Sequence, residues 1–91
     1  MIFRWDSAKA AANLTKHGVD FSEAATVLED PLSTTFPDRE HSRLERRYVT
    51  VGMSANRRLL VVSHTEKGDV VRIISVRRTT RRERRFYEEG S

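Results

Sequence analysis

The sequence predicts a single α+β domain in which helices at both ends of the chain pack on a small antiparallel sheet of three or four strands. Two observations support this prediction. The 91 residues suffice for one hydrophobic core but not for two, so residues 1–91 are expected to form one domain. The apolar residues follow a helical spacing up to Pro31 and alternate after it, which indicates helices first and strands later.

The first helix is expected over residues 7–17. Asp6 is a suitable N-cap, the alanine-rich segment favours a helix, and Gly18 is well placed to end it. His17 lies in the last turn, where a cation interacts favourably with the helix dipole, so a capping role is as reasonable as a ligand-binding one. Three polar residues form one stripe of this helix at i, i+4 and i+7: Lys9, Asn13 and Lys16. Such a stripe usually faces solvent.

A second helix is expected over about residues 21–29. Asp20 and Glu23 have the spacing of a capping box, in which each side chain binds the backbone N–H of the other residue. Pro31 disfavours a helical conformation in the residue before it, so the helix should end before that point.

The sequence after Pro31 predicts strands and a last helix. The first strand signal is weak, and the segment from Asp38 to Arg46 is expected to be a polar loop or a short helical turn. The expected strands cover residues 32–36, 47–53, 59–64 and 70–76. Thr80 and Glu83 form a second capping-box pattern, which predicts that a C-terminal helix begins there.

The last predicted strand carries or adjoins two arginines, Arg72 and Arg77. A separation of five residues places them on opposite faces of a regular strand, so they should not both line one site. In that arrangement Arg72 lies on the face of Val70, Ile74 and Val76, opposite Val71 and Ile73. We favour Arg77 as a phosphate contact because it continues toward the basic C-terminal segment.

The charge is distributed unevenly along the chain. Residues 1–45 carry five Lys/Arg and eight Asp/Glu, whereas residues 46–91 carry twelve Lys/Arg and five Asp/Glu. Eleven of those twelve cations are arginines, whose planar guanidinium groups suit bidentate phosphate binding. The basic half is therefore compatible with a polyanionic partner, although an acidic protein or a merely solvated surface would also fit.

Several classes of protein are disfavoured by composition. The chain has no cysteine, which leaves neither disulfides nor thiolate zinc ligands, and it has no glycine-rich phosphate loop. No apolar run approaches the ~20 residues of a membrane helix, and Asp6 lies where a signal peptide would be apolar. We expect a cytoplasmic protein without a cofactor and without contact to a membrane.

The segment between Asp38 and Arg47 is the best candidate for chemistry, because it alone mixes a histidine with carboxylates and arginines. Cleaving RNA without a metal needs a base, an acid and cations that offset the charge developing on phosphorus. His41 could supply the first or second of these functions, whereas His64, at the end of the most apolar strand, is more readily explained as structural. A solvated surface loop remains an alternative interpretation of the segment.

A metal site is a further alternative for this segment. Three carboxylates could offer oxygen ligands to a hard cation: Asp38, Glu40 and Glu45. The arginines between them lower the affinity of the loop for a cation, so we expect no metal site.

Taken together, these segments resemble the BrnT family. The matching residues begin with Phe3-x-Trp5-Asp6-x-x-Lys9-x-x-x-Asn13-x-x-Lys16-His17-Gly18-Val19-x-Phe21-x-x-Ala24 and Asp30-Pro31. They continue with His41-Ser42-x-x-Glu45-x-Arg47, Gly52, Arg72-Ile73-Ile74-Ser75-x-Arg77 and Glu83-Arg84-x-x-Tyr87. The resemblance covers nearly the whole chain, and its departures at Leu28 and Val76 concern packing.

The resemblance implies a RelE-like fold and the activity of a ribonuclease toxin of a type II toxin–antitoxin system, which cleaves RNA and halts translation. It also implies inhibition by a BrnA-type antitoxin, which contacts operator DNA, in an assembly that contains a toxin homodimer. From the matching positions and the basic segments we expect catalytic roles for His41, Glu45, Arg47 and Arg77. The expected RNA-binding residues are Lys16, His17, Arg39, Arg78 and Arg81.

Two non-catalytic functions compete with this one. The first is a nucleic-acid-binding or regulatory module, but the second predicted helix carries acidic residues and no Lys or Arg, which is unsuitable for a helix in a DNA groove. The second is a toxin that has lost its activity and survives as a partner-binding protein. His41 and Glu45 argue against that loss because they would have no need to remain.

Overall fold

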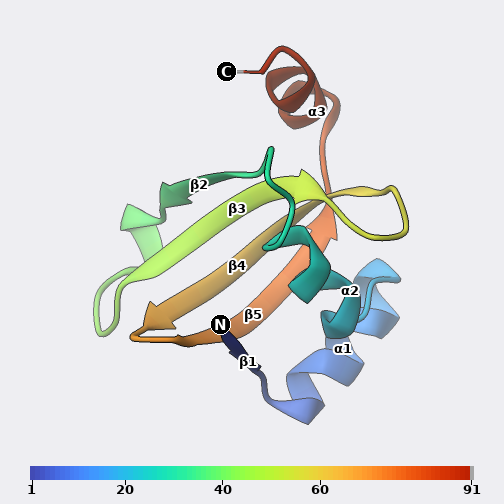
Figure 1. Ribbon diagram of the computed structural model, residues 1–91. Coiled ribbons are helices and arrows are strands. Elements are labelled where there is room, and N and C mark those ends of the chain that lie inside the picture. The colour runs from blue at the N-terminus through green and yellow to red at the C-terminus, as the bar shows by residue number, and fades with distance from the viewer. Residues whose placement is uncertain (91) are drawn as a thin grey trace.

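The computed structural model describes residues 1–90 and shows a mixed sheet with helices at three places around it (Figure 1). The elements in chain order are β1 (Ile2–Arg4), α1 (Ser7–His17), α2 (Phe21–Val27), β2 (Thr34–Pro37), the 3₁₀ helix η1 (Arg39–His41), β3 (Arg47–Met53), β4 (Leu59–Lys67), β5 (Val70–Arg78) and α3 (Arg81–Glu88). No helix among residues 1–90 combines the length and the apolar character that crossing a membrane would require.

The sheet has five strands in the order β1-β5-β4-β3-β2. Strands β2 to β5 pair antiparallel, whereas β1 pairs parallel with β5 through Ile2–Arg4 and Val70–Arg72. The α+β class and the order of the long elements are confirmed. The expected RelE-like sheet of three or four antiparallel strands must be corrected to a five-stranded mixed sheet, because a strand of three residues is too short to show an alternating pattern.

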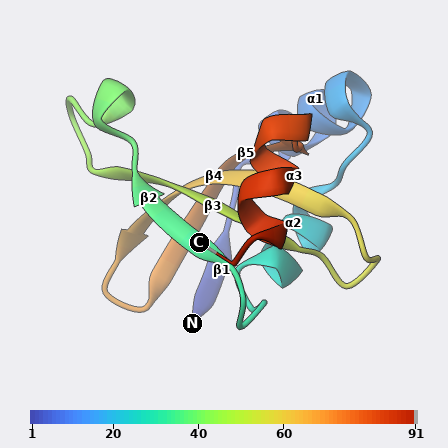
Figure 2. The same ribbon diagram turned by 90° about the horizontal axis from the view of Figure 1, so that it is seen from above.

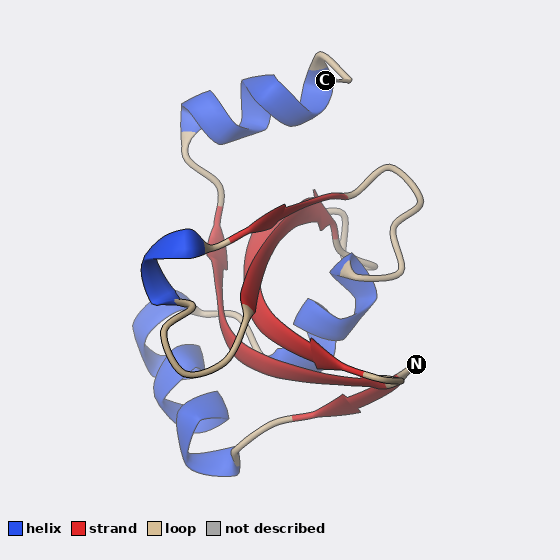
Figure 3. Cartoon of the chain, turned by 90° about the vertical axis from the view of Figure 1, so that its left-hand side faces the viewer, coloured by secondary structure: helices blue, strands red, loops and turns tan. Residues whose placement is uncertain are grey.

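The hydrophobic core lies between α2 and one face of the sheet. The buried residues of this cluster come from the α1–α2 connection, α2, β4 and β5: Val19, Phe21, Ala24, Val27, Leu60, Val62, Ile73 and Val76. Figure 3 shows α2 packed against this face and α3 beside one end of the sheet. We call the opposite side of the sheet the second face; strand alternation and register direct Val49, Val61, Thr65 and Arg72 toward it.

Helix α1 has the predicted ends but not the predicted polar stripe. The Asp6 side chain accepts from Lys9 N, and Gly18 adopts a left-handed conformation with φ 71°. Lys9 and Lys16 are exposed, but Asn13 between them is only 7% exposed. Its amide binds the backbone of Val76 on β5, so this residue of the stripe docks the helix and does not face solvent.

Helix α2 begins at the predicted N-cap but lacks the predicted reciprocal bond. Asp20 accepts from Glu23 N, whereas the Glu23 carboxylate accepts from Ser54 Oγ at 2.6 Å and from Arg58 Nε at 2.9 Å. The expected capping box is therefore half formed, because Glu23 is buried under the β3–β4 turn and bonds there. The helix also ends two residues before the expected Glu29, at Val27.

A bulge in β5 changes which of its residues share a face. Ser63 pairs with Ser75 and His64 pairs with Ile73, so Ile74 is an extra residue in the strand. Val76 consequently joins Ile73 in the core, which corrects the predicted alternation. Arg72 and Arg77 both point to the second face, and the expectation that they lie on opposite faces is wrong.

Helix α3 packs over one end of the second face. Thr80 and Glu83 form the predicted capping box. The ring of Phe86 lies 5.7 Å from that of Phe36 on β2, and Tyr87 Oη donates to Asp30 Oδ2 at 2.6 Å. The helix is thereby fixed to both β2 and the segment that follows α2.

Candidate active site in the loop between β2 and β3

The loop between β2 and β3 is closed by hydrogen bonds at its base. Asp38 N donates to Arg47 O at 2.8 Å, and Arg47 N donates to Ser42 Oγ at 3.0 Å. The Ser42 hydroxyl in turn donates to Asp38 O. Ser42 thus satisfies backbone groups of both loop ends, which holds η1 and its side chains in a defined position.

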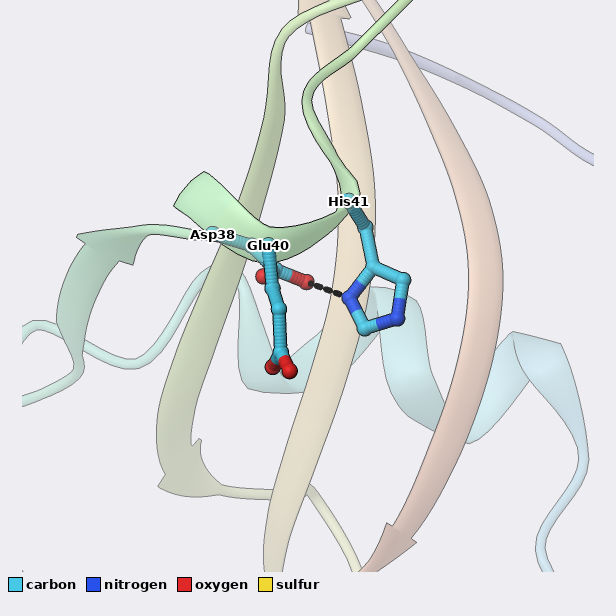
Figure 4. A group of neighbouring side chains, drawn as sticks. All are labelled: Asp38, Glu40 and His41. Carbon is cyan, nitrogen blue, oxygen red and sulfur yellow. Dashed lines mark hydrogen bonds and ion pairs between the residues drawn. The ribbon is translucent and has the colours of Figure 1, made fainter.

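His41 is paired with Asp38 across the single turn of η1 (Figure 4). Nδ1 of His41 lies 2.9 Å from Oδ2 of Asp38, and because an ionised carboxylate can only accept, this nitrogen carries the proton. The Asp38 side chain is 17% exposed and that of His41 is 60% exposed. The imidazole therefore has one nitrogen held by the protein and the other, Nε2, available to a ligand.

Three of the four predicted catalytic residues lie together. A hollow of about 310 Å³ is lined by Glu40, His41, Arg43, Leu44, Glu45 and Arg47. It brings an imidazole, carboxylates and guanidinium groups within one small volume. These are the kinds of group that cleavage of a phosphodiester without a metal requires.

Arg72 joins this group from β5, whereas the sequence pattern favours Arg77 as the phosphate contact. Its guanidinium forms an ion pair with the Glu45 carboxylate. Thr65 pairs with both Arg47 and Arg72 in the strand register, so the two arginines lie in one row across β3, β4 and β5. The sequence carries no local signal for this, because the pairing of β3, β4 and β5 and the path of the loop bring the two residues together.

Arg77 lies elsewhere on the second face. Its row contains Val61 and Val51, and Val51 is four residues along β3 from Arg47, about 13 Å away. Its guanidinium donates to both oxygens of Glu83, at 2.8 and 2.9 Å. This hydrogen bonding raises the pKa of Arg77 and lowers the pKa of Glu83 to about 2. Arg77 thus anchors α3 in this structure.

The structure places Lys16 and His17 on the other side of the molecule from His41. Both line a hollow of about 230 Å³ between α1 and β5, together with Lys9 and Ser75. Figures 1 and 2 both show α1 and η1 at opposite sides. An RNA that contacts both regions would have to extend across the protein.

The remaining predicted RNA-binding residues surround α3. Arg39 lines a groove of about 600 Å³ between η1, the β2–β3 pair and α3, whose floor includes Phe36, Val49 and Phe86. Arg78 and Arg81 are exposed at the end of β5 and the start of α3. Of these three residues, only Arg39 belongs to the loop that carries His41.

The loop also contains a set of side chains that could bind a metal. One ligand atom each from Asp38, Glu40 and His41 lies within 4.8 Å of the others. Figure 4 shows the Asp38 carboxylate beside the imidazole and the Glu40 carboxylate below it. Glu45, the third carboxylate considered from the sequence, is paired with Arg72 instead.

Comparison with known proteins gives a family and a fold. A family model described as the ribonuclease toxin BrnT of type II toxin–antitoxin systems matches residues 5–83. The structure is similar to the 1.1 Å crystal structure of the Brucella abortus ribonuclease toxin BrnT, with a TM-score of 0.68 and 22% sequence identity. That match covers 89% of this chain and 100% of the Brucella chain. No curated protein matches the chain. Because the family model spans most of its length, the chain belongs to the BrnT family of ribonuclease toxins of type II toxin–antitoxin systems.

Proposed function

We propose that this protein is a metal-independent endoribonuclease whose active site is the hollow that His41, Glu45 and Arg47 share with Arg72 beside it. The proposal rests chiefly on one observation, the Glu45–Arg72 ion pair next to the Asp38–His41 pair. Together with Arg47, which lines the hollow, these pairs offer two proton-transfer groups and two guanidinium cations in a small volume. Membership of a ribonuclease toxin family supports RNA as the substrate.

The proton-transfer roles follow from the partners of each group. The Glu45 carboxylate lines the hollow and is positioned by the Arg72 guanidinium, so it is suited to accept the proton of the ribose 2′-hydroxyl. The 2′-oxygen then forms a bond to phosphorus while the bond from phosphorus to the 5′-oxygen breaks. His41, whose Nδ1 is held by Asp38 and whose Nε2 is available to a ligand, is suited to protonate the departing 5′-oxygen. The products are a 2′,3′-cyclic phosphate and a 5′-hydroxyl.

The cations would stabilise the transition state. Charge accumulates on the non-bridging phosphate oxygens during attack, and guanidinium groups placed beforehand stabilise it without reorganisation. Arg47 lines the hollow and Arg72 borders it, so both can reach a phosphate held there. Arg77 would contribute indirectly through α3, whereas Lys16 and His17 could only contact a distant part of the RNA.

The biological role that we propose is the one the family implies. Cleavage of RNA would halt translation, and a BrnA-type antitoxin would neutralise the toxin and contact operator DNA. The toxin would form a homodimer within that assembly. Co-purification of the toxin with the protein encoded beside it, followed by measurement of the mass of the complex, tests this part separately from the chemistry.

The catalytic proposal is tested by incubating the antitoxin-free protein with end-labelled RNA in EDTA. We expect His41→Ala to reduce the cleavage rate about 10²- to 10⁴-fold, the usual contribution of a general acid or base. Glu45→Gln should have a similar effect. Glu29→Gln removes a carboxylate from the exposed end of the α2 segment and should leave the rate unchanged.

Each other result has a definite meaning. Equal cleavage by the wild type and His41→Ala would show that the site lies elsewhere. Cleavage that appears only when magnesium is restored would favour metal chemistry at Asp38, Glu40 and His41. A protein that binds RNA but never cuts it would be a non-catalytic nucleic-acid-binding module.

A further inference from the structure

The strand β1 places an additional arginine next to the proposed site. Arg4 pairs in register with Arg72, and Phe3 before it packs against the core. Because successive side chains of a strand point to opposite faces, Arg4 points to the second face, as Arg72 does. The row that begins at Arg47 therefore continues through Thr65 and Arg72 to Arg4.

The charges of this row are unbalanced. Its three arginines have one carboxylate partner among residues 1–90, that of Glu45 in the adjacent loop, which pairs with Arg72. Arg4 forms no ion pair with any residue between 1 and 90. Like charges directly opposite each other in a sheet are destabilising, so the neighbouring Arg4 and Arg72 require a compensating anion or solvent.

The guanidinium group of Arg47 also lacks a partner, at the nitrogen nearest the backbone. Its Nε is buried and has no hydrogen-bond acceptor among the described residues. A buried donor without an acceptor is rare in native proteins and often marks the position of an anion or a water that completes the site. The row thus lacks negative partners at both of its ends.

We propose that Arg4 binds the RNA backbone, so that the substrate crosses the second face from β3 over β4 and β5 to β1. This inference rests on the proposed function and adds a residue outside the hollow to the substrate-binding surface. Neighbouring strands lie about 5 Å apart, so Arg47 and Arg72 are separated by about 10 Å and Arg4 lies about 5 Å further on. A row of cations of this length suits consecutive phosphates of one strand and exceeds what a single phosphate needs.

Phosphates are favoured over other anions by the chemistry of the row. Arginine presents a planar pair of N–H donors that matches two phosphate oxygens, and the row contains no lysine. Contacts of this kind contribute affinity without reading sequence. Arg4 should therefore strengthen the binding of any RNA and should not alter the position of cleavage.

The test measures the affinity of the full-length protein for a fully 2′-O-methylated RNA oligomer, which cannot be cleaved through its 2′-oxygen. Fluorescence anisotropy over a series of salt concentrations gives both the dissociation constant and its salt dependence. Arg4→Gln removes the charge, whereas Arg4→Lys keeps it. Arg57→Asn is the control, because it removes one charge from the β3–β4 turn, about 20 Å from Arg47 along β3. Asparagine tolerates the φ of 61° found at this position.

We expect Arg4→Gln to weaken binding about two- to fivefold, the effect of losing one solvated charge contact. The slope of log affinity against log salt should fall in magnitude by about 0.7, the value for one phosphate contact on a single strand. Arg4→Lys should retain the slope, and Arg57→Asn should change neither quantity measurably. Unchanged circular dichroism spectra would show that the variants remain folded.

The inference is overturned if Arg4→Gln binds as tightly as Arg57→Asn with the same salt dependence. Cleavage of unmodified RNA is assayed in parallel and reports on the proposed function alone. Active enzyme with Arg4-independent binding would contradict this inference only. Arg4-dependent binding without cleavage by the wild type would contradict the proposed function and leave the binding surface in place.

Discussion

The Asn13 side chain hydrogen-bonds to backbone groups of β5 at the edge of that strand. Strand β1 pairs with β5 only as far as Arg72, so the next part of that edge has no neighbouring strand. The Asn13 side chain accepts from Val76 N at 3.0 Å and donates to Val76 O and Val19 O, each at 2.9 Å. One buried amide thereby joins α1, the α1–α2 connection and the sheet.

We expect Asn13→Ala to lower the free energy of unfolding by about 2–4 kcal/mol, because it leaves several buried backbone groups without partners. Urea unfolding of the variant and the wild type measures the difference. Thr15→Ala, at an exposed position of the same helix, is the control and should change stability by less than about 0.5 kcal/mol. A shift no larger than that of the control would show that water replaces the amide without cost.

Residues whose partners are close in sequence were predictable, and residues with distant partners were not. The caps at Asp6, Gly18 and Thr80 depend on neighbours within three or four positions, and all three were predicted from the sequence. Asn13 bonds to a residue 63 positions away, and Glu23 bonds to one 35 positions away. Their polar side chains therefore indicated a solvated stripe and a capping box instead of the buried contacts that they make.

At the scale of elements, the bulge at Ile74 is the feature that determines the composition of the second face. A regular strand would put Arg77 on the core side, whereas the extra residue moves Val76 into the core and Arg77 out of it. The sequence indicates the strand but not the bulge, because Ile73 and Ile74 are both apolar and suit either face. The bounds of β3 agree with the prediction, since seven alternating residues specify them locally.

The close approach of β3 to the end of α2 depends on Gly52. A Cβ atom at Gly52 would lie 2.8 Å from Cβ of Ser33, 3.1 Å from Oδ2 of Asp30 and 3.2 Å from Cγ1 of Val27. Gly52→Ala would force these groups apart, and we expect it to cost about 1–3 kcal/mol of stability. Thermal unfolding measures the effect.

Gly68→Asn provides the matched control for that experiment. Gly68 has φ 60°, which asparagine tolerates, and nothing lies within 4 Å of an added Cβ. The melting temperature of the Gly68→Asn variant should stay close to that of the wild type. If Gly52→Ala were as stable as Gly68→Asn, the segment after α2 would have to be able to move away from β3.

At the scale of the whole molecule, the candidate site depends on how the loop and the sheet are placed. The sequence identified His41, Glu45 and Arg47 as one group because they lie within seven residues, and they line one hollow. It could not identify Arg72 or Arg4, which reach the same row only through the order of strands in the sheet. For the same reason it grouped Lys16 and His17 with His41, although α1 and η1 lie at opposite sides (Figures 1 and 2).

Three carboxylates join distant parts of the molecule, and because their pKa values are depressed, stability should fall at low pH. Hydrogen bonds from Arg58 and Ser54 outweigh burial and lower the pKa of Glu23 from 4.5 to about 2. The Arg77 guanidinium lowers the pKa of Glu83 in the same way. Burial alone would raise the pKa of Asp30, but bonds donated by Met53 N, Tyr87 Oη and Leu32 N outweigh it and lower that pKa.

His64 adds a second dependence at higher pH. It is 2% exposed, its Nε2 lies 2.7 Å from Thr50 Oγ1, and its Nδ1 has no partner among residues 1–90. Burial lowers its pKa from the ordinary value of 6.5. The unfolded chain therefore binds a proton at a higher pH than the folded one, and stability falls as the pH drops below 6.5.

We therefore expect the free energy of unfolding to be greatest above pH 6.5 and to fall in two stages on acidification. The first stage is due to His64, and the second begins near pH 4.5 as carboxylates with a depressed pKa take up protons toward pH 2. Urea unfolding at successive pH values measures both stages.

Glu23→Gln should lower stability near neutral pH by on the order of 2 kcal/mol, after allowing for solvent screening of the partly exposed Arg58, and should flatten the second stage only. His64→Gln should flatten only the first. If Glu23→Gln left the acid stage as steep as in the wild type, protonation of Glu23 would not be the cause of that stage. The loss of stability in acid would then be due to Glu83 and Asp30, which hold α3.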